Sequence, residues 1–154
     1  MFDDLGAFKD WWLATRVINT PADAKLNNYN GVLGVVLYRQ DPYQVQLFIT
    51  PPNFVIEPHI HPDVDSYEVF IGGNIEFMCD GRWLLDRKDG SSRLGEHFRV
   101  SPQSWHGGNF GENGGCFLSI QKWLNGVKPS SVGANWHDKD NNKTVTDQTS
   151  HPKA

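Results

Sequence analysis

The sequence has little of the features that most readily mark secreted or membrane proteins. Its 154 residues include two cysteines, too few for a disulfide framework and consistent with reduced thiols in a cytoplasm. No run of about 18 apolar residues suggests a membrane helix. The N-terminus, from Met1 to Leu5, lacks the basic start and apolar core of a signal peptide. We therefore expect a cytoplasmic protein that does not bind membranes.

An excess of positive charge is also missing. The chain carries 14 Lys and Arg residues against 18 Asp and Glu residues, with the two signs interleaved. This pattern gives no basic stripe for nucleic acid and no polybasic patch for anionic lipid. A chain of this length forms one domain. The expected partners are a small-molecule substrate and a second copy of the chain.

Helical periodicity is confined to the first residues. Asp3 or Asp4 can cap a short helix. Its apolar stripe is formed by Leu5, Phe8, Trp11 and Trp12. We expect this helix to pack on the outside of a sheet or on a partner subunit.

Short β-prone segments dominate the rest of the chain. They begin at Val32 and are separated by turns of Gly, Pro and Asp, which indicates an all-β sandwich or barrel closed from antiparallel strands. We divide the chain into an N-terminal helix and connection (1–31), a β-barrel (32–125) and a C-terminal extension (126–154). The extension has few apolar residues, and we expect part of it to be disordered.

Three histidines provide the main chemical signal. If residues 54–61 form a strand, His59 and His61 lie on one face with their rings roughly 7 Å apart. His106 follows after a further series of predicted strands. A ligand set of imidazoles and one carboxylate favours Fe(II), Mn(II) or Zn(II). A lone His-x-His pair is common by chance, and His97 is interpreted as an ordinary strand histidine.

The spacing of these residues resembles the cupin superfamily. The first cupin motif is Gly, five residues, His-x-His, three or four residues, Glu, six residues, Gly. Here His59-Ile60-His61 is followed by three residues, Asp65, six residues and Gly72, with Asn53 in place of the leading Gly. The second motif is approximated by Gly95, Pro102, His106 and Asn109, with Ser104 where a Gly is usual.

The resemblance implies a cupin-type jelly roll, or double-stranded β-helix barrel, with one divalent transition metal at its mouth. The implied ligands are His59, His61, Asp65 and His106. Fe(II) is the first expectation, followed by Mn(II), Zn(II) or Ni(II). Cupins pair through an outer sheet face, and the apolar N-terminal helix offers further surface, so we expect a homodimer.

The acidic ligand is ambiguous. Aligning the motif on Gly72 selects Asp65, whereas aligning it on Gly73 selects Ser66 and makes Glu68 the nearest carboxylate. Strand alternation favours Asp65, because it points Ser66 and Glu68 outward. The residues that it points inward are Tyr67, Val69 and Ile71. If neither carboxylate reaches the metal, the site has three histidine ligands only.

The resemblance also implies a metal-dependent enzyme that acts on a small organic substrate chelating through adjacent oxygens. We expect a dioxygenase first, with lyase or isomerase chemistry close behind. Glu68, if it is not a ligand, is the candidate base, and Gln121 is a candidate hydrogen-bond donor to substrate. Arg82 and Arg99 are candidates for binding a substrate carboxylate. The alternative is a non-catalytic cupin that binds a sugar or another small metabolite.

Overall fold

The computed structural model describes residues 2–22, 24, 26–29, 31–87, 94–124 and 132–133. Within them lie α1 (Leu5–Thr15), β1 (Asn27–Tyr29), β2 (Val32–Gln40), β3 (Tyr43–Thr50), β4 (Val55–Ile60), β5 (Val64–Cys79), β6 (Arg82–Arg87), β7 (His97–Val100), β8 (His106–Trp123) and β9 (Val132–Gly133). None of the helices in these residues is both long and apolar enough to cross a bilayer. Apart from β9, the predicted C-terminal extension lies outside the described residues.

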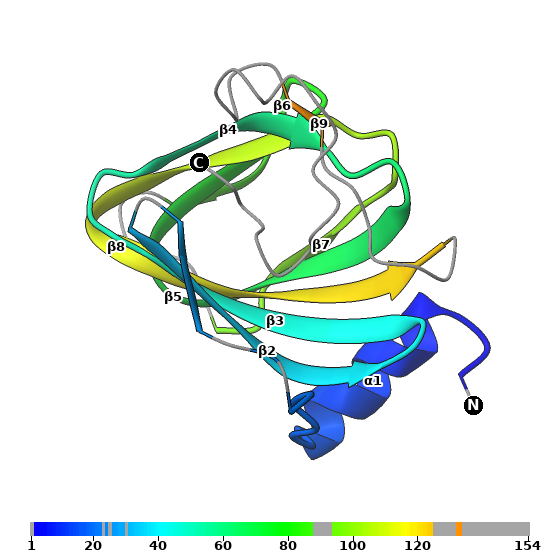
Figure 1. Ribbon diagram of the computed structural model, residues 1–154. Coiled ribbons are helices and arrows are strands. Elements are labelled where there is room, and N and C mark those ends of the chain that lie inside the picture. The colour runs from blue at the N-terminus through cyan, green and yellow to red at the C-terminus, as the bar shows by residue number, and fades with distance from the viewer. Residues whose placement is uncertain are drawn as a thin grey trace.

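The strands form two antiparallel layers that share their two longest members. The first layer has the order β1-β2-β3-β8-β5-β7. The second has the order β9-β4-β8-β5-β6. Because β5 and β8 take part in both layers, the sheet curves into the ring of strands seen in Figure 1. The predicted all-β jelly roll is confirmed.

Glycines allow β5 and β8 to pass from one layer to the other. Gly114 of β8 has a φ of +67°, and a Cβ atom there would run into the carbonyl oxygen of Thr50. The facing part of β5 changes register at Gly72 and Gly73. A residue with a side chain would be strained at Gly114, so glycine fixes where the barrel turns its corner.

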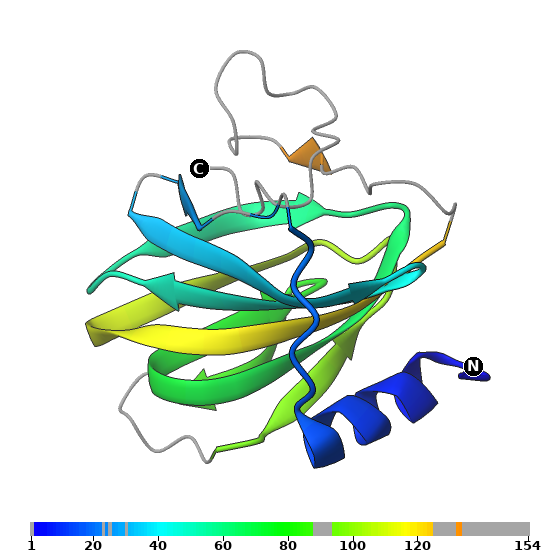
Figure 2. The same ribbon diagram turned by 60° about the horizontal axis from the view of Figure 1, so that its bottom comes forward.

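Helix α1 lies outside the barrel, as the sequence predicts (Figure 2). The Asp4 side chain caps it by accepting a hydrogen bond of 2.8 Å from the backbone N–H of Ala7. Its buried residues pack on the outer face of β2, β3, β5 and β8; they are Leu5, Phe8 and Trp12. Much of the apolar stripe is therefore used within the chain, and the homodimer stays a prediction.

One end of the barrel interior is apolar. Phe48, Phe117 and Phe70 form a row across β3, β8 and β5 of the first layer. Phe77 and Phe110 of the second layer belong to the same cluster. The ring centroids of Phe77 and Phe117 are 5.1 Å apart, so the two layers meet here.

The opposite end of the interior is polar, and we call it the mouth. In the first layer, a polar row toward this end consists of Arg39, Gln44, Gln121 and Ser66, on four neighbouring strands. In the second layer, the corresponding row consists of His59, His106 and Cys79. Because the apolar rows of both layers meet at one end, the polar rows face each other across the mouth.

The predicted facing of β5 is wrong. Ser66 and Glu68 point into the barrel, where both are buried beside residues of β8. Tyr67, Val69 and Ile71 point outward and pack under α1. Alternation identifies two faces of a strand but does not say which one is inside, because here the outer face is also covered.

Candidate metal centre

Three histidines meet at the mouth. Each of His59, His61 and His106 offers one ring nitrogen that lies within 4.8 Å of the nitrogens offered by the other two. All three side chains are buried. A metal–nitrogen bond of about 2.1 Å requires these atoms to lie within about 4 Å of one another, so small side-chain rotations bring them to ligand distance. The group can hold a metal ion.

Local backbone contacts orient two of the rings. The Nδ1 atom of His59 lies 2.8 Å from the carbonyl oxygen of Glu57, and that of His106 lies 3.1 Å from the carbonyl oxygen of Ser104. A carbonyl only accepts, so each Nδ1 carries the hydrogen and each Nε2 keeps its lone pair. Hydrogen bonding of one ring nitrogen commonly prepares the other for a metal.

The backbones of β4 and β8 approach each other closely beside the histidines. Gly107 follows His106 on β8, and a Cβ atom there would lie 2.5 Å from the carbonyl oxygen of Ile56 on β4. Between Ile56 and His59 the pairing of β4 with β8 shifts register, and His59 then lies directly opposite His106. The close approach of the two strands at Gly107 thus brings the first and third histidines together.

Burial also favours the metal-binding form of His106. It lowers the pKa of this imidazole to about 4, although the hydrogen bond to Ser104 opposes the shift. At neutral pH the ring is therefore uncharged, as a ligand must be.

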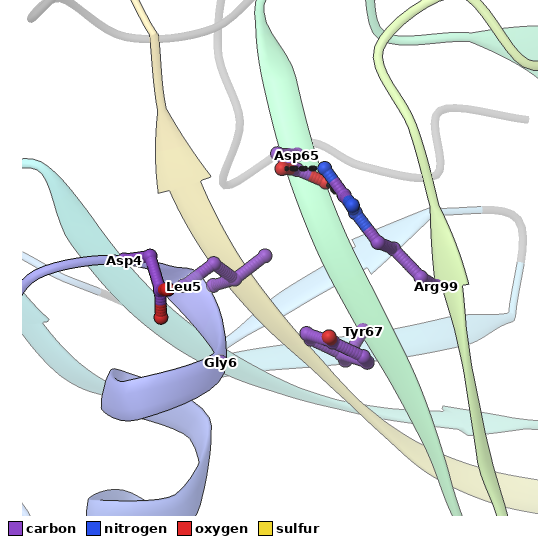
Figure 3. A pocket seen from close by; sticks show the side chains of 6 residues that line it. All are labelled: Asp4, Leu5, Gly6, Asp65, Tyr67 and Arg99. Atoms are coloured by element: carbon purple, nitrogen blue, oxygen red, sulfur yellow. Dashed lines mark hydrogen bonds and ion pairs between the residues drawn. The ribbon is translucent and has the colours of Figure 1, made fainter.

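Asp65, the predicted fourth ligand, is not brought to the histidines. Its carboxylate lies outside the barrel and accepts two hydrogen bonds from Arg99, of 2.8 Å from Nε and 2.5 Å from Nη2 (Figure 3). The pair lines a small outer pocket together with Asp4, Leu5, Gly6 and Tyr67. Arg99, a sequence candidate for substrate binding, is therefore already paired with a carboxylate.

Glu68 lies inside the barrel instead. Its Oε2 atom accepts hydrogen bonds of 2.9 Å from Ser66 and 2.8 Å from Ser119. Burial raises the pKa of Glu68 to about 7, against the opposing effect of the two serine hydrogen bonds. A carboxyl group in this setting can hold or release a proton near neutral pH.

Gln121 points into the barrel, but its amide is fully engaged. Its nitrogen donates to Gln46 at 3.0 Å and to Ser119 at 3.1 Å. Its oxygen accepts from Gln44 at 3.1 Å and from Trp123 at 3.3 Å. With both amide hydrogens used, Gln121 organises the polar lining of the mouth and has no spare donor for a substrate.

Sequence reasoning missed Arg39 and Gln44 of the polar row. Both occur in segments whose apolar alternation suggests ordinary strands. A signal was nevertheless present, because Gln44 and Gln46 occupy alternate positions of β3 and so share one face. The face that they share is the interior of the barrel.

Comparisons with known proteins agree with this architecture. A protein from Shewanella frigidimarina described as an RmlC-like cupin superposes with a TM-score of 0.57 at 14% identity, over 70% of this chain and 91% of the other. The chain folds as a cupin. KdgF from Halomonas sp. gives a TM-score of 0.54 at 16% identity, over 65% of this chain and 84% of the other.

An oxalate decarboxylase from Lactobacillus farciminis matches this chain with a TM-score of 0.56 at 15% identity, over 71% of this chain and 33% of that larger one. At such identities the likeness concerns the fold alone. No family model matches the sequence, and no curated protein matches it. The chemistry must therefore be argued from the residues of the mouth.

Proposed function

We propose that this cupin is a metal-dependent enzyme that acts on a small organic substrate chelating through adjacent oxygens. The observation that carries the proposal is the buried group of His59, His61 and His106. Fe(II) is the proposed metal, since imidazole suits iron and iron can pass electrons to O₂. Three protein ligands leave further coordination positions for substrate oxygens.

Bound in this group, the metal would supply Lewis acidity to the substrate oxygens and, if it is iron, manganese or nickel, an electron path to O₂. The proposed reaction is oxidative cleavage, in which both atoms of O₂ enter the products and no other reductant is needed. The three histidines are buried, and electrostatic interactions are stronger away from bulk water.

Glu68 favours a second candidate reaction. A buried carboxyl with a pKa of about 7 can take a proton from carbon and return it, which is the requirement of a lyase or isomerase. Either reaction would use the same substrate class. Glu68 would hold the proton on its carboxyl group, with the serine hydrogen bonds fixing its orientation.

The test is a metal analysis of protein purified without added metal or chelator, followed by turnover assays. Assays of O₂ uptake and of exchange of substrate C–H for solvent deuterium, on diketones, hydroxy acids and catechols, separate the two reactions. Stoichiometric iron with O₂ uptake supports the dioxygenase, and exchange without O₂ uptake supports the lyase or isomerase. Bound metal without turnover of any kind would favour the non-catalytic alternative.

A further inference from the structure

Arg39 is the most unusual charged residue of the described interior. It lies at the end of β2, in the polar row that faces the histidines across the mouth. Its Nη2 atom is buried and makes no hydrogen bond with the described residues. Leaving a guanidinium nitrogen buried without an acceptor is costly, so such an atom is a strong candidate for binding an anion.

The neighbours of Arg39 fix its guanidinium group without neutralising it. The Nε atom donates a hydrogen bond of 2.6 Å to the Gln44 side-chain oxygen. The Cζ atom lies 5.2 Å from the centre of the Trp123 ring, in a cation–π contact. Gln121 accepts from both Gln44 and Trp123, which ties the two supports together. None of these supports carries a negative charge.

Arg99 on the outer face provides the contrast. Its guanidinium is satisfied by the two oxygens of Asp65. Arg39 contacts the Gln44 side chain and the Trp123 ring, but it forms no ion pair with a carboxylate among the described residues. A planar fork of N–H donors with this arrangement suits a carboxylate.

We propose that Arg39 binds a carboxylate of the substrate, so that the substrate class is a short hydroxy or oxo acid with a second carboxylate away from its chelating oxygens. This inference rests on the proposed function, because it places the chelating end at the three histidines. Packed sheets lie about 10 Å apart and inward side chains shorten that gap, so a short carbon chain reaches both groups.

The test compares L-malate with L-lactate, which has the same hydroxy-acid end but no second carboxylate. Calorimetric titrations use the nickel-loaded protein and the metal-free protein. We expect wild type to prefer malate by about 10- to 100-fold, the range for a charge-assisted hydrogen bond. Arg39→Ala should reduce the preference to below about threefold, and Arg39→Lys should restore part of it.

Arg99→Ala is the matched control, since it removes an arginine from the outer face and should leave the preference intact. Nickel content and circular dichroism of each variant exclude loss of the centre or of the fold. If Arg39→Ala does not fold, Arg39→Gln takes its place, because it removes the charge and keeps more of the side-chain volume than alanine does. A wild type without preference for malate, or a preference that survives loss of Arg39, would overturn the inference.

The two proposals can fail separately. Stoichiometric nickel together with an Arg39-independent affinity for malate would reject the carboxylate site and leave the metal centre standing. Failure to hold nickel, with an Arg39-dependent preference for malate persisting at lower affinity in the metal-free protein, would reject the metal centre and support the carboxylate site.

Discussion

The outer face of β5 and the interior of the barrel near the mouth each contain a carboxylate and an arginine, but the two regions give these groups different partners. Outside, Asp65 and Arg99 pair with each other at the protein surface. Inside, Glu68 contacts two serine hydroxyls and Arg39 contacts a glutamine and a tryptophan ring. Two charged groups that neutralise each other in solvent need no ligand. Charged groups that are buried apart from each other shift their protonation or bind a partner.

Substitutions of the three histidines should have the largest effect on the interior site and none on the outer ion pair. Replacing His59, His61 or His106 by alanine should each weaken metal binding by more than about 100-fold, because even the loss of a residue that only orients a ligand costs 10- to 100-fold. The measurement is metal affinity by competition with a chromogenic chelator. His97→Ala is the control, since His97 is exposed on β7 and its Nδ1 lies 3.0 Å from the carbonyl oxygen of Gly95. Unchanged affinity in any two of the three variants would contradict the assignment.

Gln121→Ala tests whether this residue supports the mouth or touches substrate. The change removes the partner of Gln44, Gln46 and Trp123 inside the barrel. We expect the free energy of unfolding to fall by about 4 kcal/mol, from several buried groups left without hydrogen bonds. Urea unfolding gives the value, and the exposed Gln103→Ala is the control. A stable variant that had lost only activity would instead assign Gln121 to substrate binding.

Glu68→Gln should remove a pH dependence of stability. The folded-state pKa of Glu68 is raised by burial to about 7 from an ordinary value of 4.5, so the wild type loses stability as pH rises through 7. The amide imitates the protonated acid. The variant should therefore match wild type below pH 4.5 and exceed it by up to about 3 kcal/mol above pH 7.

The measurement is urea unfolding of metal-free wild type and variant from pH 4 to pH 8. His106 acts in the opposite sense, because its lowered pKa costs stability as pH falls toward 4. The difference between the two proteins isolates Glu68. A constant difference across this range would show that the pKa of Glu68 is not raised in the folded protein.

Asp65→Asn should have the smallest effect. It breaks the ion pair with Arg99, whose side chain is 56% exposed, and such pairs contribute less than about 1 kcal/mol. Metal affinity should not change, because the carboxylate lies outside the barrel. Chelator competition and urea unfolding check both points. A tenfold loss of metal affinity would show that Asp65 reaches the centre in solution.

The three histidines of the candidate metal centre could be predicted from the sequence because the features that mark them are local. Two histidines on alternate positions share a face wherever the strand lies, and the glycine and proline turns fix how many strands follow. The series of short β-prone segments separated by turns was also enough to indicate a sandwich or barrel. The acidic residue could not be assigned in this way, since Asp65 and Glu68 lie on opposite faces of one strand.

The sequence by itself determined an all-β chain with His59 and His61 on one face of a strand, because alternation follows from backbone geometry. The spacing of these two residues and of His106 resembled that of the cupin motifs, and the structure has the cupin fold. Only the tertiary structure decided which face of β5 is inside, since α1 covers the other face and makes both faces partly buried. It also decided that Arg39 faces the histidines. That placement arises from the way β8 turns from one layer to the other, which brings residues distant in sequence to the same mouth.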